Sequence, residues 1–486
     1  MTRTFKVYSL LLQAVILFLI ALGMLPDYAV WVTVALVSAV LLFAKLDDAV
    51  EYFILSIPFF FVLPGTLSDS FSSWRVYLSL LGLRTVPWLF ARRKQIFSGV
   101  SVREPVFWLI CFLTFMALSS LWAHFPVTAL KQVIFWTHLA WIIPIAYVSR
   151  ITLHRLFSAC MYSLAIYAGF GFIQLIIFTV SDFYFFWQFW ANNVTSVLFG
   201  KSLSMASTYS NSWFDMNDGS LRMFSLFPSS HAFGLAMMFL IATVLMVGAP
   251  SYLFVGAAVL LALSQSRGVW VGSLASALSA GILWLYVRGT GAKRNAKLYA
   301  CAFLLLISAP VVNFAVGVIK ETSGSGLSFE RGVSIFDLQE SSNAGRLAIW
   351  RDTLRYAASH PFGTGAGNFV VSLFDGQVPS SITEAGETLN KRYNLPQKYI
   401  SAHNLYLHEL VELGMIGFSL FFAFIGSIFF KLWARRYEYI PSVLLVLFAG
   451  IFTYMLFDTT LLNDRLLLYF FILFCYTNSV FHKKSA

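Results

Sequence analysis

The chain has 486 residues, of which 59% are hydrophobic and only 11% charged, and its mean hydropathy is +0.76. A soluble protein of this length needs far more charge on its surface, so the composition excludes a soluble protein and indicates that lipid is part of its solvent. The net charge of +11 does not indicate a nucleic-acid partner, because the basic residues are not gathered into one patch.

Apolar runs that are long enough to cross about 30 Å of hydrocarbon recur along the chain. The runs are 7–25, 28–44, 52–64, 76–91, 105–123, 132–149, 156–181, 229–249, 252–266, 268–287, 298–319, 404–430, 439–457 and 466–481. Two of them either span the membrane or form a re-entrant pair, because 52–64 is short and contains two prolines and 76–91 carries Arg84 in its middle. The pattern predicts an all-α integral membrane protein with about 12–14 transmembrane helices.

Lysine and arginine in the short connections predict the orientation of the helices. With the N-terminus inside and the helices alternating, the inside connections hold more than half of the 33 basic residues. These are Arg3, Lys6, Lys45, Arg92, Arg93, Lys94, Arg103, Arg150, Arg155, Arg288, Lys293, Arg294, Lys297, Lys431, Arg435, Arg436, Lys483 and Lys484. Both termini are therefore predicted to be cytoplasmic.

Two connections on the predicted outer side are long. The first, from about Ser181 to Pro228, is rich in aromatic residues and is expected to lie along the membrane interface: Phe183, Tyr184, Phe185, Phe186, Trp187, Phe189 and Trp190. The second, residues 320–402, is the large extracytoplasmic loop. We therefore divide the chain into a membrane bundle (1–319), this loop (320–402) and C-terminal membrane helices (403–486), all within one integrated membrane domain.

The large loop is predicted to contain a helix, which favours a functional loop over a disordered one. Its apolar residues recur at helical spacing, and Asn343 is a candidate N-cap. The apolar residues are Leu347, Trp350, Leu354 and Ala357. His360-Pro361 and the glycines at 363, 365 and 367 predict a tight turn after the helix.

Three arginines stand at the predicted outer face. Arg222 and Arg267 lie at the outer ends of predicted spans, and Arg346 opens the loop helix. Each is either an interfacial anchor or part of a substrate path. Three together favour the substrate path, and arginine suits phosphate because its planar guanidinium forms two charge-assisted hydrogen bonds.

His403, at the junction of the large loop with a span, is the candidate for proton transfer near neutral pH, unless it only bonds the backbone at the start of the helix. His231 is a weaker candidate, and Asp458 and Asp464 bracket the last outer turn. Glu412 is expected to pair with an arginine. These carboxylates lack the close spacing of metal ligands, and the four cysteines are unpaired within apolar runs, so we predict no metal site and no disulfide framework.

Four motifs carry a resemblance to a known family. They are Ser-Arg-Gly-Val-Trp-Val-Gly (266–272), Gly-Arg-Leu-Ala-Ile-Trp (345–350), His-Pro-Phe-Gly-Thr-Gly-Ala-Gly-Asn-Phe (360–369) and His-Asn-Leu-Tyr-Leu-His-Glu-Leu-Val-Glu-Leu-Gly-Met-Ile-Gly (403–417). In order and spacing they resemble the O-antigen ligase and O-antigen polymerase family. Arg222 with Phe224-Ser225-Leu226-Phe227 is similar to a further motif of that family, although Ser-Ser-His (229–231) stands where the family often has Pro-Asn.

The resemblance implies a GT-C-like membrane glycosyltransferase of the bacterial plasma membrane that acts at the outer, periplasmic face. Such enzymes transfer a glycan from undecaprenyl diphosphate to an acceptor hydroxyl, with inversion and without a metal or cofactor. By position, His403 would be the general base, with Arg267 and Arg346 also catalytic. The implied substrate-binding residues are Arg222, Glu412, Trp350 and Asn404.

The acceptor separates two alternatives within the family. A polymerase extends a lipid-linked glycan and is expected to have a chain-length regulator as a partner, whereas a ligase uses lipid A-core. The length of the chain favours a polymerase. The alternative of another class is a transporter or flippase for lipid-linked glycan, which needs charged residues along several mid-membrane helices. The unusual charges here gather at one predicted face, which favours the enzyme.

Overall fold

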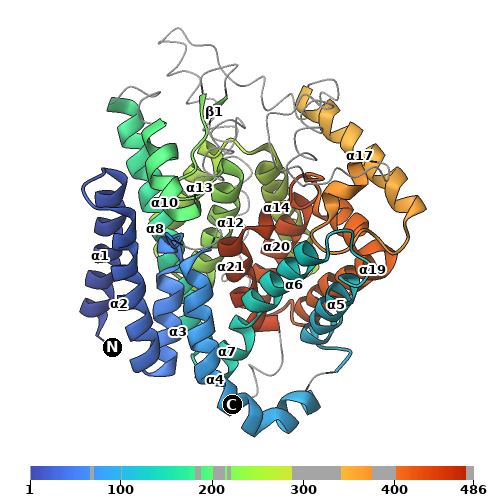
Figure 1. The fold of residues 1–486 in the computed structure, drawn as a ribbon, viewed down its shortest axis with the longest axis horizontal. Helices are drawn as coiled ribbons and strands as arrows, with labels where there is room; N and C mark the ends of the chain where they lie inside the picture. Colours follow the sequence, from blue (N-terminus) through green and yellow to red (C-terminus); the bar gives the residue numbers. More distant parts are fainter. Residues whose placement is uncertain are drawn as a thin grey trace.

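The computed structural model describes residues 2–65, 71–99, 101–180, 188–200, 214–215, 220–286, 341–374 and 401–477. In its first half the helices are α1 (Arg3–Ala21), η1 (Asp27–Ala29), α2 (Val30–Phe43), α3 (Leu46–Leu55), η2 (Ile57–Phe59), α4 (Ser73–Gly99), α5 (Pro105–Ser119), α6 (Pro126–Ala140), α7 (Ile142–Ser149), α8 (Leu153–Val180), the π-helical η3 (Trp190–Thr195) and α10 (Ser196–Phe199). They form a bundle of roughly aligned helices (Figure 1).

The second half supplies the helices that carry the site. These are α12 (Ser230–Val247), α13 (Ser251–Leu263), α14 (Arg267–Tyr286), α17 (Ser341–Ser359), η5 (Phe369–Phe374), α19 (Leu405–Ala434), α20 (Tyr439–Tyr454), η6 (Thr460–Leu462), α21 (Asp464–Phe474) and η7 (Cys475–Thr477). The strands in the described part are two residues each, β1 (Phe214–Asp215) antiparallel to β2 (Ser220–Leu221). Figure 1 shows α17 lying across one end of the bundle, above α19.

The protein is an all-α integral membrane protein, as its composition predicts. Among the described residues, six helices are long and apolar enough to cross a membrane, and four further apolar helices are shorter. The six are Arg3–Ala21, Pro126–Ser149, Leu153–Ile177, Ser230–Val247, Arg267–Tyr286 and Leu405–Ala434. The predicted span 298–319 and the division at residue 320 lie outside the described residues, so the total of about 12–14 spans and the domain limits stay predictions.

The two doubtful runs near the N-terminus lie in α3 with the buried chain after it and in α4. Helix α3 has 10 residues, about 15 Å, which is too short to cross the hydrocarbon. The chain after it is buried at Phe60, Phe61 and Leu63, reverses, and returns as α4, with Val62 bridged to Ser72. The short α3 favours the re-entrant alternative for 52–64, whereas α4, which contains 76–91, has 27 residues and is long enough to cross.

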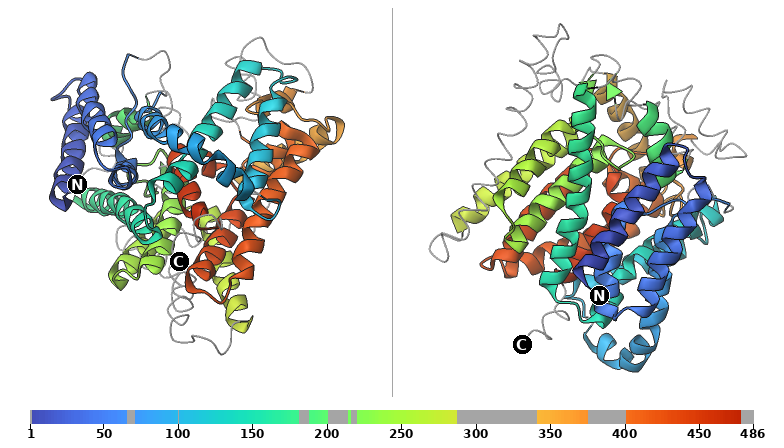
Figure 2. Two further views of the ribbon diagram at one scale, coloured as in Figure 1. Left: turned by 90° about the horizontal axis from the view of Figure 1, so that it is seen from below. Right: turned by 90° about the vertical axis from the view of Figure 1, so that its left-hand side faces the viewer.

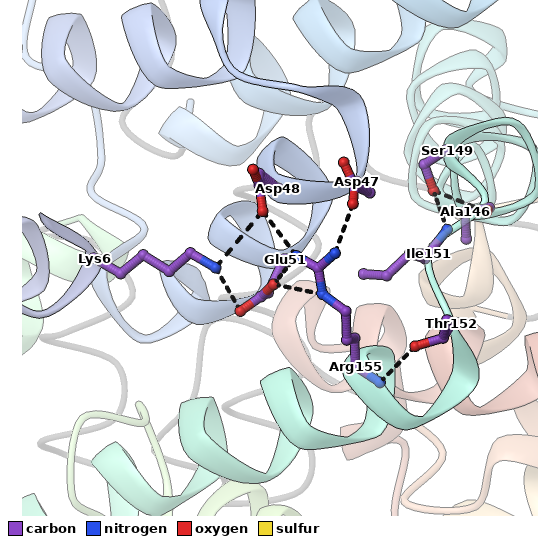
Figure 3. A network of polar contacts seen from close by, with 9 residues as sticks. All are labelled: Lys6, Asp47, Asp48, Glu51, Ala146, Ser149, Ile151, Thr152 and Arg155. Atoms are coloured by element: carbon purple, nitrogen blue, oxygen red, sulfur yellow. Dashed lines mark hydrogen bonds and ion pairs between the residues drawn. The ribbon is translucent and has the colours of Figure 1, made fainter. Parts of the chain in front are cut away.

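One end of the bundle gathers basic residues that were predicted to share a side. Lys6 Nζ lies 2.6 Å from Glu51 Oε1, and Arg155 bonds to Asp47, Asp48 and Glu51 (Figure 3). The network continues through η7, because the Tyr476 ring packs on Phe157 and its hydroxyl accepts a hydrogen bond of 3.1 Å from Arg435. Lys431 pairs with Glu104 at 2.7 Å in the same region of α19. Helices α1 and α8 begin at this end, because Lys6 lies in the first turn of α1 and Arg155 in the first turn of α8, and α21 ends just before Tyr476. The N-terminus that precedes α1 is marked in both views of Figure 2.

Small residues let α14 pack closely against α20, with the start of α14 beside the end of α20. A Cβ atom on Gly272 would lie 2.8 Å from the carbonyl oxygen of Gly450, and one on Gly450 would lie 2.0 Å from Ser276 Oγ. Gly268 similarly faces the Tyr454 ring at 3.0 Å. Close approach of backbones through small residues is the usual packing of membrane helices. Because α14 begins at Arg267 and α20 ends at Tyr454, this contact brings Arg267 near the turn that contains Asp458.

Candidate active site

Three turns meet at the end of the bundle opposite to the charged network. Each contains a non-glycine residue in the left-handed region: Ser225 (φ 54°), Gln265 (φ 50°) and His403 (φ 47°). Such backbone costs about 1–3 kcal/mol per residue and persists only where the surroundings hold it. Its concentration in three turns that lie together is typical of a functional site.

The first turn, from Arg222 to Pro228, is held from several sides. The Ser225 amide donates a hydrogen bond to Gln174 Oε1 at 2.7 Å, and the Ser225 carbonyl accepts one from the Trp190 indole at 2.9 Å. The fully buried Arg465 donates to the carbonyl of Leu226 at 3.3 Å. Trp190 is therefore an interior residue, contrary to the expected interfacial position, and residues 181–187 of that segment lie outside the described part. The turn is rigid, and Arg222 stands at its start.

The second turn joins α13 to α14. Its backbone is tied to the first turn, because the Met223 amide donates to the Leu263 carbonyl at 3.1 Å. Ser266 Oγ lies 2.7 Å from His231 Nδ1, which comes from the first turn of α12. Arg267 follows directly and is half-buried. Arg222, His231 and Arg267 are thus placed at one end of three neighbouring helices.

The third turn carries His403 and is fixed at both ends. The Trp350 indole nitrogen donates to the Ala402 carbonyl at 2.8 Å, and the Leu405 amide donates to the Met455 carbonyl at 2.8 Å. Asn404 is the N-cap of α19, since its Oδ1 accepts from the Leu407 amide at 3.1 Å. Within the described residues, the buried His403 Nδ1 has no hydrogen-bond partner. The backbone on both sides of His403 is therefore fixed.

The pKa of His403 is lowered below its ordinary value. Burial of the ring is the largest cause, and the positive charge of Arg346 adds to it, while Asp458 acts in the opposite direction. A lowered pKa keeps the imidazole neutral near pH 7, which is the form that accepts a proton.

Asp458 lies where the elements of the site converge. It follows α20, is only 9% exposed, and its Oδ2 lies 3.6 Å from His231 Nδ1. Burial raises the pKa of its carboxyl, but the charges of His231, His403 and Arg346 lower it more, so the net shift is downward. The Asp458 carboxylate thus lies beside the His231 imidazole and within electrostatic range of His403 and Arg346.

A glycine-rich loop, residues 363–367, packs against α19 beyond the third turn. Residues Gly363, Gly365 and Gly367 all have positive φ, and they cross α19 at Gly414, where the helix is kinked (φ 63°, ψ −169°). Glu412 binds this loop: its Oε2 accepts from the Gly367 amide at 2.6 Å. Its Oε1 accepts from the Phe369 amide at 3.1 Å and lies 3.1 Å from His408 Nε2.

Much of this candidate site lies within a segment that matches a known protein family. Residues 252–422 match the family model described as O-Antigen ligase. This segment belongs to the O-antigen ligase family. No curated protein matches the chain. The match supports a glycosyltransferase-like enzyme of O-antigen and polysaccharide biosynthesis.

The O-antigen ligase segment contains most of the predicted site, and the structure brings three of those residues together. Arg267, Arg346 and His403 lie within electrostatic range of His231 or Asp458. Arg222 lies at the start of the first turn, which is bonded to the second turn through the Met223 amide. Arg351 and Arg355, expected on the solvated face of α17, are 71% and 73% exposed and approach Asp352 at 3.7 and 3.6 Å.

Three residues expected to bind substrate use their polar groups inside the fold. Trp350 and Asn404 fix the backbone on either side of His403, and Glu412 binds the glycine-rich loop and His408 rather than an arginine. Glu412 is only 3% exposed. This geometry favours a positioning role over contact with substrate for all three.

The loop helix differs in detail from its prediction. Helix α17 begins at Ser341, so Asn343 lies inside its first turn rather than at the cap. The buried face runs through Ile349, Thr353 and Tyr356, while Leu347 and Leu354 are 42% and 50% exposed. The predicted apolar positions and the buried positions have the same helical spacing, but the buried positions lie about one residue earlier in the chain.

The sequence did not predict that two residues, His231 and Asp458, are central to the candidate site. His231 ranked as a weak candidate and Asp458 only as a residue of the last outer turn, and both lie outside the O-antigen ligase segment. The available signal was a carboxylate directly after an apolar run, at the same predicted face as three arginines. Among the described residues, no group of three histidine, cysteine or acidic side chains is placed to hold a metal ion.

Proposed function

We propose that this protein transfers a glycan from undecaprenyl diphosphate to an acceptor hydroxyl at the outer face of the bacterial plasma membrane. The observation that carries the proposal is the convergence of His403 with Arg346, Arg267 and Asp458 at one end of a membrane bundle, within a chain whose 252–422 segment belongs to the O-antigen ligase family. Glycosyl transfer from a diphosphate needs a base for the acceptor hydroxyl and cations for the leaving group, and these residues can supply both.

In the proposed reaction His403 removes the proton of the acceptor hydroxyl. Its lowered pKa supplies the neutral form, and general base catalysis contributes about 10²–10⁴-fold in rate. The acceptor oxygen attacks the anomeric carbon from the side opposite to the diphosphate, so the configuration inverts.

The arginines stabilise the leaving group. As the bond between the anomeric carbon and the phosphate oxygen breaks, negative charge grows on the diphosphate, and cations fixed in advance in a site shielded from water stabilise it strongly. Arg267 begins a helix that is held against α20 by glycine packing, and Arg346 lies on α17, one turn before Trp350. Arg222 is the third candidate for phosphate contact.

The acceptor is a second lipid-linked glycan for a polymerase and lipid A-core for a ligase. A polymerase would act with a chain-length regulator. A transporter is less well supported, because the arginines and histidines of the site gather at one end of the described bundle and not along a path through it.

The test is transfer by the purified protein in lipid nanodiscs, with the lipid-linked glycan as donor and each acceptor in separate reactions. We expect a ladder of extended lipid-linked products or a single product on lipid A-core. His403→Ala should lower turnover by at least about 10²-fold while the protein stays folded and inserted. Near-normal turnover of a folded His403→Ala variant would rule out His403 as the base.

A further inference from the structure

Arg465 is a fully buried arginine at which the first half of the chain meets the candidate site. It is the second residue of α21, and 0% of its surface is exposed. Its guanidinium donates to the carbonyl oxygens of Phe60 at 2.6 Å, Leu198 at 3.1 Å and Leu226 at 3.3 Å. The centroid of the Phe199 ring lies 3.9 Å from the guanidinium carbon. One side chain therefore binds three backbone segments that are far apart in the sequence.

Each of these carbonyls comes from a place where regular secondary structure ends. Phe60 directly follows η2, Leu198 lies in the four-residue α10, and Leu226 belongs to the first turn of the site. Carbonyls at such positions lack a helical partner, and a buried carbonyl without a donor is costly. Arginine suits this position because its planar guanidinium carries five donors and stays protonated. A buried charge is stable only when it is hydrogen-bonded, so Arg465 and the three carbonyls fix one another.

The first turn of the site has further supports from the first half of the chain. Ser225 Oγ donates to the Tyr167 carbonyl at 2.6 Å, and the Tyr167 ring stacks on Phe227 with centroids 4.2 Å apart. Gln174 of α8 bonds to both the amide and the carbonyl of Ser225. These supports lie outside residues 252–422, the segment of the family match. The first half of the chain therefore holds in place a turn of the candidate site.

We propose that Arg465 is a positioning residue of the transferase: by binding the Leu226 carbonyl, it sets the first turn and so places Arg222 against the donor diphosphate. This inference rests on the proposed function, in which Arg222 contacts phosphate. Arg465 has no exposed surface, so it acts through the turn and not by contact with the substrate. Through Phe60 and Leu198, the buried chain after α3 and helix α10 share in this positioning.

The main variant is Arg465→Lys, which keeps the charge. A lysine amino group is a compact donor on a flexible stem, so it cannot hold three carbonyls in the fixed planar arrangement of a guanidinium. We expect KM for the lipid-linked donor to rise roughly tenfold, the scale of one hydrogen bond from a charged group, with KM for the acceptor unchanged. Equilibrium binding of undecaprenyl diphosphate, which has the phosphates without the glycan, should weaken by the same factor.

Arg84→Lys is the matched control. Arg84 also donates to two backbone carbonyls, those of Leu41 and Ala44. These carbonyls lie at the end of α2, three residues or more before Asp47 of the charged network, and so at the end of the bundle opposite to the site. The variant makes the same chemical change there, and it should leave donor KM and the binding of undecaprenyl diphosphate unchanged.

The double variant Arg465→Lys with Arg222→Ala tests whether Arg465 acts through Arg222. Once Arg222 is absent, its position no longer matters, so adding Arg465→Lys should change the binding of undecaprenyl diphosphate by no more than roughly twofold. Equal factors for Arg465→Lys in the presence and absence of Arg222 would show independent effects and would overturn the proposed coupling.

If Arg465→Lys does not fold, Phe199→Leu replaces it. This change removes the ring against the guanidinium and leaves Arg465 with its three acceptors, so donor KM should rise by a smaller factor. A folded Phe199→Leu protein with unaltered donor KM would then overturn the inference.

The outcomes separate this inference from the proposed function. Unaltered donor KM in a folded Arg465→Lys protein, in a preparation that transfers glycan, would overturn the role of Arg465 and leave the transferase standing. A lower apparent kcat with unaltered donor KM would also overturn it, since a purely structural residue changes only the fraction of active protein. No transfer by the unaltered protein to either acceptor would contradict the proposed function itself, and this inference with it.

Discussion

The Trp350 indole donates a hydrogen bond of 2.8 Å to the carbonyl of Ala402, the residue before His403. Trp350 lies four residues after Arg346 on α17, and side chains at this spacing share one face of a helix. One contact therefore sets the position of a candidate phosphate ligand relative to the candidate base. Helix α17 and the third turn are thus joined next to the proposed base.

Trp350→Phe should lower kcat about tenfold and leave donor KM nearly unchanged. Phenylalanine retains the aromatic ring but cannot donate the hydrogen bond, which contributes about 1 kcal/mol in net terms. Steady-state kinetics with the lipid-linked donor measures both constants. A raised KM with unchanged kcat would instead indicate that Trp350 binds the substrate directly.

The sequence predicts the parts of this site that depend on local patterns. Glycines at 363, 365 and 367 predict a tight turn, and each has positive φ in the structure. The contact between His231 and Asp458 has no such signature, because it depends on how α12 and α20 pack across the bundle. The roles of Trp350, Asn404 and Glu412 were also out of reach, since a polar side chain near a site looks the same whether it faces a substrate or a backbone amide.

The crossing of the glycine-rich loop over α19 predicts a sharp effect at Gly414. In Gly414→Ala the new Cβ would lie 2.1 Å from the Pro361 carbonyl oxygen, at a backbone φ of 63°. We expect a loss of about 2 kcal/mol or more in the free energy of unfolding, with loss of transfer. The measurement is the melting temperature of the protein in detergent, together with turnover.

Gly426→Ala is the matched control on the same helix. A Cβ there has no heavy atom within 4 Å, and alanine is a better helix former than glycine by about 0.5–1 kcal/mol. Its melting temperature should stay equal or rise. Equal destabilisation by both substitutions would mean that the kink at Gly414 does not need glycine.

The predicted topology is tested by reporter fusions. Fusions within residues 288–297 and 431–438 should report the cytoplasm, and fusions within 320–402 should report the outer side, because basic residues concentrate in the former connections. A cytoplasmic location for 320–402 would separate α17 from an outward-facing donor and would end the proposed mechanism.

The pKa of His403 predicts the pH dependence of transfer. Since burial and Arg346 lower this pKa below its usual 6.5, the base stays neutral down to a pH below that value. kcat/KM should therefore be level from pH 7.5 to about 6.5 and fall only at lower pH, as the imidazole gains a proton. Arg346→Met should raise the pKa and move this fall to higher pH. An acid limb that stays in place in Arg346→Met would show that Arg346 does not act on the base.

Arg→Lys substitutions separate a phosphate site from an interfacial anchor. Lysine keeps the charge but loses the planar guanidinium, so a site that grips diphosphate through two hydrogen bonds is damaged by the change, whereas an anchor tolerates it. Arg267→Lys and Arg346→Lys should each lower turnover by about 10²-fold, the effect of losing one preorganised donor to a transition state. Arg351→Lys and Arg355→Lys are the controls, because these side chains lie on the same helix as Arg346 but are largely exposed. Turnover in all four variants is measured with the same donor and acceptor, at a pH on the plateau. Full activity in Arg267→Lys and Arg346→Lys would exclude the guanidinium contacts from the mechanism, while the family membership of residues 252–422 would be unaffected.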